Sequence, residues 1–440
     1  MNKRIRTRNT IILAISVVQL AIYGLIFYYA WLNNYHELVY FHRKGNWLLM
    51  AVYVVLFLMF SSLYDGFKLG SSKTTDLIFS QVIANLFSLI CLYIIASLVN
   101  KTFIEISGFL VIALILTVTI ILLNVVINKV FTKTVAPLNS VYLYTEGNDE
   151  VLNKINKYQK GFFNVTNSIN LDKEKFDEDI LKSYDCIFIC GLDNSFKLKL
   201  VNECYELGKS IYVVPTYTDI ILQCSSECNL IDTPLLQCNT FGPTQFEKIV
   251  KRCFDIVFSL LLLIVTSPLM LLVAIAIKCE DGGPVLYKQV RLTRHKKQFN
   301  IYKFRSMRVD AEKNGVQFAK AHDDRITKVG RFIRACRLDE LPQLFNILKG
   351  DMSVVGPRPE RPEIQTEILK ELPEFDYRLK VKAGLTGFAQ VYGKYNTKLN
   401  DKLLFDLIYI ENYSLFLDLK IMFLTFKILF SKDSTEGYDN

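Results

Sequence analysis

Histidine and charged side chains are scarce in this sequence of 440 residues, which has four His and only 22% Asp, Glu, Lys and Arg. Apolar residues make up 51% of the chain and the mean hydropathy is +0.24, a composition that excludes intrinsic disorder. The 20 glycines are far too few for a collagen-like repeat. Ten scattered cysteines are too sparse for a disulfide scaffold, which indicates a reducing compartment for the soluble parts.

Several catalytic and binding signatures are also absent. No spacing of His and Cys matches a zinc site and no Ser-His-Asp arrangement is visible, so these chemistries are disfavoured. The net charge of +9 calls for an acidic partner, either phosphate groups or an anionic membrane surface. Nucleic acid is not expected, because no helix-turn-helix, zinc finger or RNP-type aromatic strand accompanies the basic residues.

Long apolar runs are abundant in the first third of the chain. Each has about the 20 residues that an α-helix needs to cross the hydrocarbon core, so residues 1–135 are predicted to form a domain of four transmembrane helices. Basic residues before the first run and after the fourth place both ends of this domain on the cytoplasmic side. Asn85 and Asn124 lie within these runs and are interpreted as interhelical hydrogen-bonding residues. The four runs are 10–31, 47–64, 77–99 and 108–130.

Residues 136–245 have the composition of a soluble α/β domain. Short apolar, β-rich runs at 141–144, 186–190 and 210–215 predict a small parallel sheet of Rossmann-like order. The turn at 145–149 lacks the spaced glycines of a dinucleotide site, so dinucleotide binding is disfavoured. A regulatory, small-ligand or dimerising role and a folded spacer are both compatible with this pattern.

A further apolar stretch, 256–277, is long enough to cross a bilayer, but Ser267 and Pro268 interrupt its middle. Proline removes a backbone donor and bends a helix, so the stretch either crosses with a kink or turns back to the same face. Basic residues flank both ends, which favours a re-entrant helix over about 252–279. A plain crossing is the alternative.

Basic residues are concentrated between 285 and 337, where fifteen Lys or Arg accompany four Asp or Glu. Basic residues at this density normally bind phosphate groups, although a basic face lying on anionic lipid would account for part of them. Asp339 and Glu340 follow directly. A carboxylate pair beside concentrated positive charge can hold a divalent cation while one member attacks phosphorus. The alternative is a helix-end ion pair with arginine.

Seven motifs that occur in one order across about 251–431 resemble the bacterial sugar transferase family, the monotopic-type polyprenyl-phosphate sugar-1-phosphate transferases. The resemblance implies that 246–440 is a mainly α-helical catalytic domain with a re-entrant membrane helix. The four amino-terminal helices and the Rossmann-like domain are similar in architecture to large members that initiate capsule, exopolysaccharide or O-antigen synthesis. The motifs are Lys251-Arg252-x-x-Asp255, Ser267-Pro268, Gly283-Pro284-Val285, Tyr302-Lys303-Phe304-Arg305-Ser306-Met307, Leu338-Asp339-Glu340-Leu341-Pro342-Gln343, Gly350-Asp351-Met352-Ser353-Val354-Val355-Gly356-Pro357-Arg358-Pro359 and Gly384-Leu385-Thr386-Gly387.

The resemblance also implies a reaction. In the family the aspartate of this dyad attacks the β-phosphorus of a UDP-sugar, so Asp339 would be the nucleophile and UMP would leave. Undecaprenyl phosphate would then take the phosphosugar from the aspartyl intermediate. Glu340 matches the family's Mg²⁺-binding glutamate, and Mg²⁺ would offset the repulsion between a carboxylate and a diphosphate.

Further site residues are expected from matching positions. Lys251 and Arg252 would lie at the level of the lipid headgroups and meet the lipid phosphate. Ser267 and Pro268 match the helix-breaking pair of the re-entrant helix. The residues expected to bind nucleotide or phosphate are Arg334, Arg358, Pro357, Pro359, Lys303 and Arg305.

The expected function is transfer of a hexose-1-phosphate, with glucose or galactose preferred, from a UDP-sugar to undecaprenyl phosphate. We expect a homodimer in the bacterial cytoplasmic membrane, with the catalytic domain on the cytoplasmic face. The alternative is a catalytically inactive scaffold or regulator of a polysaccharide assembly complex. A processive glycosyltransferase is disfavoured because no convincing D-x-D motif is found.

The carboxyl-terminal apolar runs 403–410 and 415–430 carry charged residues. They are too charged for easy membrane crossing and are expected to lie in the membrane interface with the apolar face down. Packing into the protein core is the alternative for the first of the two runs.

Overall fold

The chain divides into two compact units, Met1–Val214 and Pro215–Asn440. The computed structural model describes residues 3–35, 43–145, 147, 149–159, 161–173, 178–238, 243–308, 325–393 and 397–429. The predicted domain limits of 135 and 245 stay predictions. The last part of the predicted middle domain, residues 215–245, belongs to the second unit.

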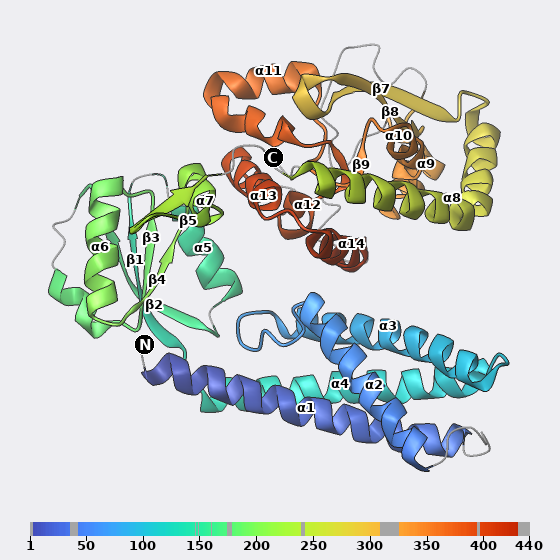
Figure 1. Cartoon of the computed structure of the whole chain (residues 1–440), viewed down its shortest axis with the longest axis horizontal. Coiled ribbons are helices and arrows are strands. Elements are labelled where there is room, and N and C mark those ends of the chain that lie inside the picture. The colour runs from blue at the N-terminus through green and yellow to red at the C-terminus, as the bar shows by residue number, and fades with distance from the viewer. Residues whose placement is uncertain are drawn as a thin grey trace. The chain divides into compact units, whose positions relative to one another are not determined.

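Four long helices begin the first unit (Figure 1). Each is long and apolar enough to cross a membrane, which confirms the apolar helices predicted for this part of the chain. The helices extend beyond the apolar runs because flanking polar residues continue the helical backbone. They are α1 (Lys3–Tyr35), α2 (Arg43–Leu63), α3 (Thr74–Asn100) and α4 (Ile106–Thr134).

Buried polar side chains connect these helices. The Tyr53 hydroxyl of α2 donates to Asn85 Oδ1 of α3 at 2.9 Å. Asn124 Nδ2 of α4 donates to Gln81 Oε1 of α3 at 2.8 Å, and the Tyr23 hydroxyl of α1 donates to the same oxygen at 3.0 Å. The interhelical bonding interpreted for Asn85 and Asn124 is therefore confirmed, since both amides bond to side chains of neighbouring helices in a region where lipid offers no partner.

A four-stranded parallel sheet with the order β2-β1-β3-β4 follows the helices in the first unit. Neighbouring residues of β1 point to opposite faces. Leu143 packs in a cluster with Leu200 of α6, whereas Tyr142 packs in a cluster with Ile155 of α5. Helices therefore cover both faces, as a parallel sheet requires. The elements are β1 (Leu138–Tyr144), α5 (Asp149–Tyr158), β2 (Phe163–Asn170), η1 (Glu178–Ser183), β3 (Cys186–Cys190), α6 (Asn194–Glu206) and β4 (Ser210–Val213).

The second unit combines helices with short strands. It begins with α7 and a two-stranded hairpin, and Ile220 of α7 packs in one cluster with Phe375 and Leu403. The hairpin β7–β8 is antiparallel, and β9 pairs in parallel with β10. The elements are α7 (Tyr217–Gln223), β5 (Ser226–Leu230), β6 (Thr233–Gln237), α8 (Gln245–Asp281), β7 (Leu286–Leu292), η2 (Arg294–Lys296), β8 (Gln298–Phe304), α9 (Lys328–Ala335), η3 (Leu338–Glu340), α10 (Gln343–Lys349), β9 (Ser353–Val355), α11 (Pro362–Glu371), η4 (Pro373–Lys380), β10 (Gly384–Thr386), α12 (Phe388–Tyr392), α13 (Leu399–Glu411) and α14 (Leu415–Leu429).

Within the described part of the chain, α8 is the fifth helix that is long and apolar enough to cross a membrane. It contains Pro268, and Figure 1 shows that it changes direction along its length. Proline cannot donate to the carbonyl four residues before it, that of Ile264. The Ser267 hydroxyl donates to this carbonyl at 2.8 Å instead. The helix thus bends without leaving that oxygen unsatisfied.

Both halves of α8 pack on the second unit. Phe258 of the first half packs against the core cluster that contains Ile347 of α10. Ile277 of the second half is buried in a cluster with Phe304 of β8. A straight helix of 37 residues would be roughly 55 Å long, so the bend is what lets its second half pack on the same unit as the first, in a separate cluster.

The two carboxyl-terminal helices pack into this core as well. Leu407 and Ile410 of α13 are buried, and so is Ile421 of α14. Asp406 of α13 and Asp418 of α14 are buried in ion pairs, with Arg378 at 2.8 Å and with Lys251 at 2.6 Å respectively. Residues 403–410 therefore pack into the protein core, which was the alternative to a position in the membrane interface. On α14, Phe416 and Phe426 are exposed.

Candidate active site

The acidic dyad lies at a backbone turn between α9 and α10. Arg337 has a φ of +53°, a left-handed conformation that side chains other than glycine rarely adopt. Arg337 follows the end of α9 and precedes the single turn η3, which carries Asp339 and Glu340. Strained backbone of this kind persists where the surrounding structure enforces it, which happens most often at functional sites.

Helix α10 is fixed to strand β8 by the fully buried Asn346. Its Oδ1 accepts a hydrogen bond from the Tyr302 backbone N–H at 2.9 Å, and its Nδ2 donates to the Asn300 carbonyl at 2.8 Å. These bonds place Lys303, the next residue of β8, beside the dyad. Lys303 Nζ lies 2.9 Å from Glu340 Oε1.

Glu340 is held in its ionised form. Burial opposes its ionisation, but the charges of Lys303, Arg358 and Arg337 outweigh burial and lower its pKa to about 2. Arg358 Nη2 lies 3.5 Å from the same Glu340 oxygen that Lys303 contacts. Glu340 is therefore a carboxylate at neutral pH, shared between two cations.

Asp339 is in a different environment. Burial and the neighbouring charge of Glu340 raise its pKa to about 6, while Lys303, Arg334 and Arg358 oppose this rise. Among the residues that the structure describes, none forms a hydrogen bond or ion pair with the Asp339 carboxylate. A carboxylate of this kind, near three cations and bonded to none of them, is available to attack an electrophile.

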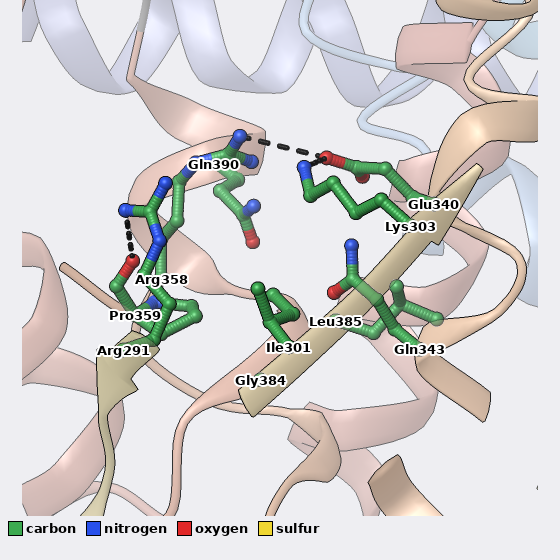
Figure 2. Close-up of a pocket in the computed structure, with 10 residues that line it drawn as sticks. All are labelled: Arg291, Ile301, Lys303, Glu340, Gln343, Arg358, Pro359, Gly384, Leu385 and Gln390. Carbon is green, nitrogen blue, oxygen red and sulfur yellow. Dashed lines mark hydrogen bonds and ion pairs between the residues drawn. The ribbon is translucent and has the colours of Figure 1, made fainter. Parts of the chain in front are cut away.

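An open pocket lies beside the acidic turn (Figure 2), and Glu340 lines it while the adjacent Asp339 does not. Polar side chains from β7, β8, η3, α10, α12 and the segment after β9 line it, and Ile301, Pro359 and Leu385 supply apolar surface. Figure 2 shows the Lys303 and Arg358 side chains both reaching the Glu340 carboxylate. The polar lining residues are Arg291, Lys303, Glu340, Gln343, Arg358 and Gln390. This combination suits a phosphorylated ligand with a polar, partly apolar body.

The segment Pro357–Pro359 is held by its backbone. Arg378, whose side chain is 4% exposed, donates from Nη2 to the Arg358 carbonyl at 2.9 Å. Arg291 Nη1 donates to the Pro359 carbonyl at 3.1 Å. The Pro357 carbonyl accepts from the Gly384 N–H at 2.9 Å. The Arg358 side chain, 49% exposed, is thereby presented to the pocket from a fixed backbone.

The structure brings some of the predicted site residues together. Lys303, Glu340, Arg358 and Pro359 line the pocket, whereas Asp339 and Pro357 are not among its lining residues. Arg334 does not line it, but its charge acts on Asp339, and its Nη1 is buried with no hydrogen-bond partner among the described residues. The assigned roles stay predictions.

Other predicted residues lie elsewhere in the second unit. Arg305 is 7% exposed and forms an ion pair with Asp281 at the end of α8, away from the pocket lining. Lys251 contacts Asp418. Arg252 donates to the carbonyls of Ile347 and Leu348 at 2.6 and 2.7 Å. Ser267 and Pro268 lie at the bend of α8.

Three polar pocket residues, Gln343, Arg291 and Gln390, were not among the predicted site residues. Gln343 directly follows the Leu-Pro of the acidic motif, and Arg291 belongs to the basic run. Their places in the sequence could therefore have identified both as site residues. Gln390 of α12 had none, and its Oε1 is buried without a hydrogen-bond partner among the described residues. Amide and guanidinium groups at these positions can orient a bound ligand.

A divalent cation fits this donor set in one way. Mg²⁺ is usually bound through one or two carboxylates together with substrate phosphates. Within the described part of the chain, no three His, Cys, Asp or Glu side chains are grouped to hold a metal. The ionised Glu340 lines the open pocket and offers one such carboxylate. The residues present therefore fit an ion held jointly by Glu340 and a bound diphosphate.

Comparison with known proteins points to one family. The Bacterial sugar transferase family model matches residues 246–432. The chain is 42% identical over 196 residues to the UDP-N-acetylgalactosamine-undecaprenyl-phosphate N-acetylgalactosaminephosphotransferase of Aeromonas hydrophila, covering 44% of this chain and 46% of the relative. It is 38% identical over 246 residues to the Undecaprenyl-phosphate galactose phosphotransferase of Salmonella typhimurium, covering 51% of this chain and 50% of the relative.

The match to a third relative covers a larger share of that relative's length. The UDP-glucose:undecaprenyl-phosphate glucose-1-phosphate transferase of Caulobacter vibrioides is 41% identical over 189 residues, which are 42% of this chain and 71% of the relative. The chain spans only about half the length of the first two relatives. The similar region contains α8, the dyad and the pocket, and on these grounds the chain belongs to the bacterial sugar transferase family.

Proposed function

We propose that this protein transfers a sugar-1-phosphate from a UDP-sugar to undecaprenyl phosphate. The observation that carries the proposal is the Asp339 carboxylate, which lies near three cations, has no bonded partner among the described residues and adjoins an ionised Glu340 in a pocket. The named relatives act on undecaprenyl phosphate. Their sugars differ, and glucose or galactose stays our preferred prediction.

The proposed reaction has two steps. Asp339 Oδ attacks the β-phosphorus of the UDP-sugar, the bond between that phosphorus and the bridging oxygen breaks, and UMP leaves with the electron pair. A phosphate oxygen of undecaprenyl phosphate then attacks the same phosphorus and releases the Asp339 carboxylate. Each step exchanges one P–O bond for another, and no redox partner is needed.

The chain's own residues supply positioning and charge. Arg358 and Lys303 are placed to contact the diphosphate, and Arg334 to stabilise the carboxylate that attacks it. The rigid backbone of Pro357–Pro359 keeps Arg358 in place. Mg²⁺, held by Glu340 and the diphosphate, would neutralise charge on the leaving phosphate.

The proposal also places the protein in the bacterial cytoplasmic membrane, as a homodimer with its catalytic residues on the cytoplasmic face. The bend at Pro268 and the packing of both halves of α8 on clusters of the same unit support a re-entrant rather than a crossing helix. Both flanks of the membrane segment would then share the compartment of the UDP-sugar.

Release of UMP tests this function. Purified protein is incubated with undecaprenyl phosphate, Mg²⁺ and each of a panel of UDP-sugars, and UMP is quantified. We expect Asp339→Asn to lower turnover by about 10⁴-fold or more, since the nucleophile is lost. Glu363→Gln, which neutralises an exposed carboxylate of α11, is the matched control and should retain activity.

Mass spectrometry of the intermediate completes the test. Incubation with UDP-sugar alone should add one phosphosugar to the peptide that contains Asp339. Turnover that survives Asp339→Asn, or a label on another peptide, contradicts the mechanism. Absence of UMP release with every UDP-sugar and with folded protein would favour the scaffold alternative.

A further inference from the structure

A cluster of three cations lies outside the active-site pocket, beside the turn that ends α10. Gly350 ends this helix with a φ of +96°, so the position is strained for any other residue. A Cβ at Gly350 would lie 3.4 Å from Arg252 Nη2 and 3.8 Å from Lys382 Nζ. The guanidinium and the ammonium groups thus border the same small space above the glycine.

Arg294 follows Thr293, whose hydroxyl connects the segments that carry Gly350 and Lys382, and the charge of Arg294 acts on Lys382. The Thr293 hydroxyl donates to the Asp351 carbonyl at 2.9 Å and accepts from the Ala383 N–H at 3.1 Å. These bonds tie together three backbone segments, and the neighbouring residues in them are Arg294, Gly350 and Lys382. The arrangement comes from three distant parts of the sequence and is fixed by buried hydrogen bonds.

The positive charge of this cluster is incompletely neutralised. Lys382 is half-buried and forms no hydrogen bond or ion pair among the described residues. Burial, with the charges of Arg252 and Arg294, lowers its pKa. Arg294 Nε is buried and has no partner in the described part of the chain. Arg252 uses two N–H groups on α10 carbonyls and has others to donate.

Two acidic residues act on Lys382, and both have other partners. Asp255 Oδ1 accepts from the Ser353 hydroxyl and from the Val354 N–H, each at 3.0 Å. Asp351 Oδ2 lies 3.5 Å from Lys349 Nζ. Neither forms an ion pair with Lys382 among the described residues. Within the described residues, no carboxylate forms an ion pair with Lys382, so an external anion could bind to this cluster.

We propose that Arg252, Arg294 and Lys382 form a binding site for the phosphate group of a membrane lipid headgroup. Arg252 lies one helical turn before Ile256, where the apolar stretch of α8 begins, so the site is at the level where headgroups meet a membrane-embedded helix. None of the three residues lines the active-site pocket. The site is thus separate from the dyad, and it extends to Arg294 and Lys382 the contact with lipid phosphate that is expected for Arg252.

Chemical labelling of lysine tests the site in the full-length protein. Acetylation of Lys382 by an N-hydroxysuccinimide ester is followed by mass spectrometry, with the exposed Lys370 of α11 as internal control. The protein is compared in nanodiscs of phosphatidylglycerol, in nanodiscs of a galactolipid without phosphate, and in maltoside micelles with and without inorganic phosphate. This set separates headgroup binding from simple shielding by a bilayer.

We expect phosphatidylglycerol to slow acetylation of Lys382 about tenfold relative to the galactolipid, with Lys370 unchanged. Arg294→Gln should reduce this protection while leaving Lys370 labelling unaltered. Protection by inorganic phosphate in micelles would support the same site and assign it to free phosphate. Equal labelling in all media, or equal protection by the galactolipid, overturns the proposal.

Discussion

Replacing Arg378 by methionine separates the structural role of a buried ion pair from its role at the active site. The Arg378 and Asp406 side chains are 4% and 1% exposed, and Arg378 Nε and Nη2 lie 2.9 and 2.8 Å from Asp406 Oδ2. Glu360 and Lys402 are the other charged groups that act on Asp406. The substitution leaves the Asp406 carboxylate buried without its bidentate partner. Breaking a buried pair in this way costs about 3–5 kcal/mol.

The loss should depend on pH. Burial already raises the pKa of Asp406, and removal of Arg378 raises it further. Because its pKa is then higher in the folded than in the unfolded state, the folded state binds more protons in the interval between the two values. Stability therefore falls as pH rises through this interval, by roughly 1.4 kcal/mol per pH unit. We expect Arg378→Met to destabilise the second unit more at pH 8 than at pH 5.5.

Hydrogen exchange followed by mass spectrometry is the suitable assay, with peptides from η4 and α13 as reporters. Tryptophan fluorescence would not report on this unit, because both tryptophans, Trp31 and Trp47, are in the first unit. The double variant Arg378→Met with Asp406→Leu removes the unpaired charge and should recover most of the stability. Equal destabilisation of the single variant at both pH values would refute this reasoning.

The same variants also test the positioning of Arg358. Arg378 Nη2 donates to the Arg358 carbonyl, and neither variant restores that bond. We therefore expect KM for the UDP-sugar to stay raised in the double variant although its stability recovers. A KM that returns to the wild-type value would show that Arg378 acts only through stability.

Three further predictions concern the site and its surroundings. Chelation by EDTA should abolish UMP release and Mg²⁺ should restore it, and Glu340→Gln should raise the Mg²⁺ concentration for half-maximal rate about tenfold or more, as a metal titration would show. Gly384→Ala should destabilise the pocket by about 1–3 kcal/mol, measured by hydrogen exchange, because its Cβ would lie 2.1 Å from the Gly356 nitrogen. Maleimide at pH 8 should modify the exposed Cys336 in the folded protein and leave Cys186 intact, because Cys186 is buried and burial raises its pKa to about 12.

Local patterns predicted those parts of the fold that depend on local sequence. The four amino-terminal helices were found because long apolar runs have no other stable arrangement in a bilayer. Strand β3 was recognised as a continuous apolar run, typical of a strand that is buried on both faces. Strand β2 was missed, because it is at the edge of the sheet and half of its side chains are exposed polar residues.

The charged residues of the carboxyl-terminal helices show where local patterns fail. The charged runs 403–410 and 415–430 suggested helices lying in the membrane interface, with core packing as the alternative for the first run. Asp406 pairs with Arg378 and Asp418 with Lys251 inside the second unit, which fits the core alternative for 403–410, while the interfacial position of 415–430 stays a prediction. The partners are 28 and 167 residues away in the sequence. No periodicity within a single segment indicates such a partner, so only the packed structure distinguishes an interfacial helix from a core helix with buried ion pairs.

The sequence by itself determined the membrane helices, the basic region and the adjacent carboxylates of Asp339 and Glu340, because hydrophobicity and neighbouring positions are properties of the chain. The tertiary structure decided which cations surround that dyad and which are paired elsewhere. Lys303 and Arg358 meet at Glu340 because Asn346 fixes β8 and Arg378 fixes the segment after β9. The sequence specifies which residues are charged. The electrostatic effect of each charge depends on its distance from other groups and on its burial, and folding determines both.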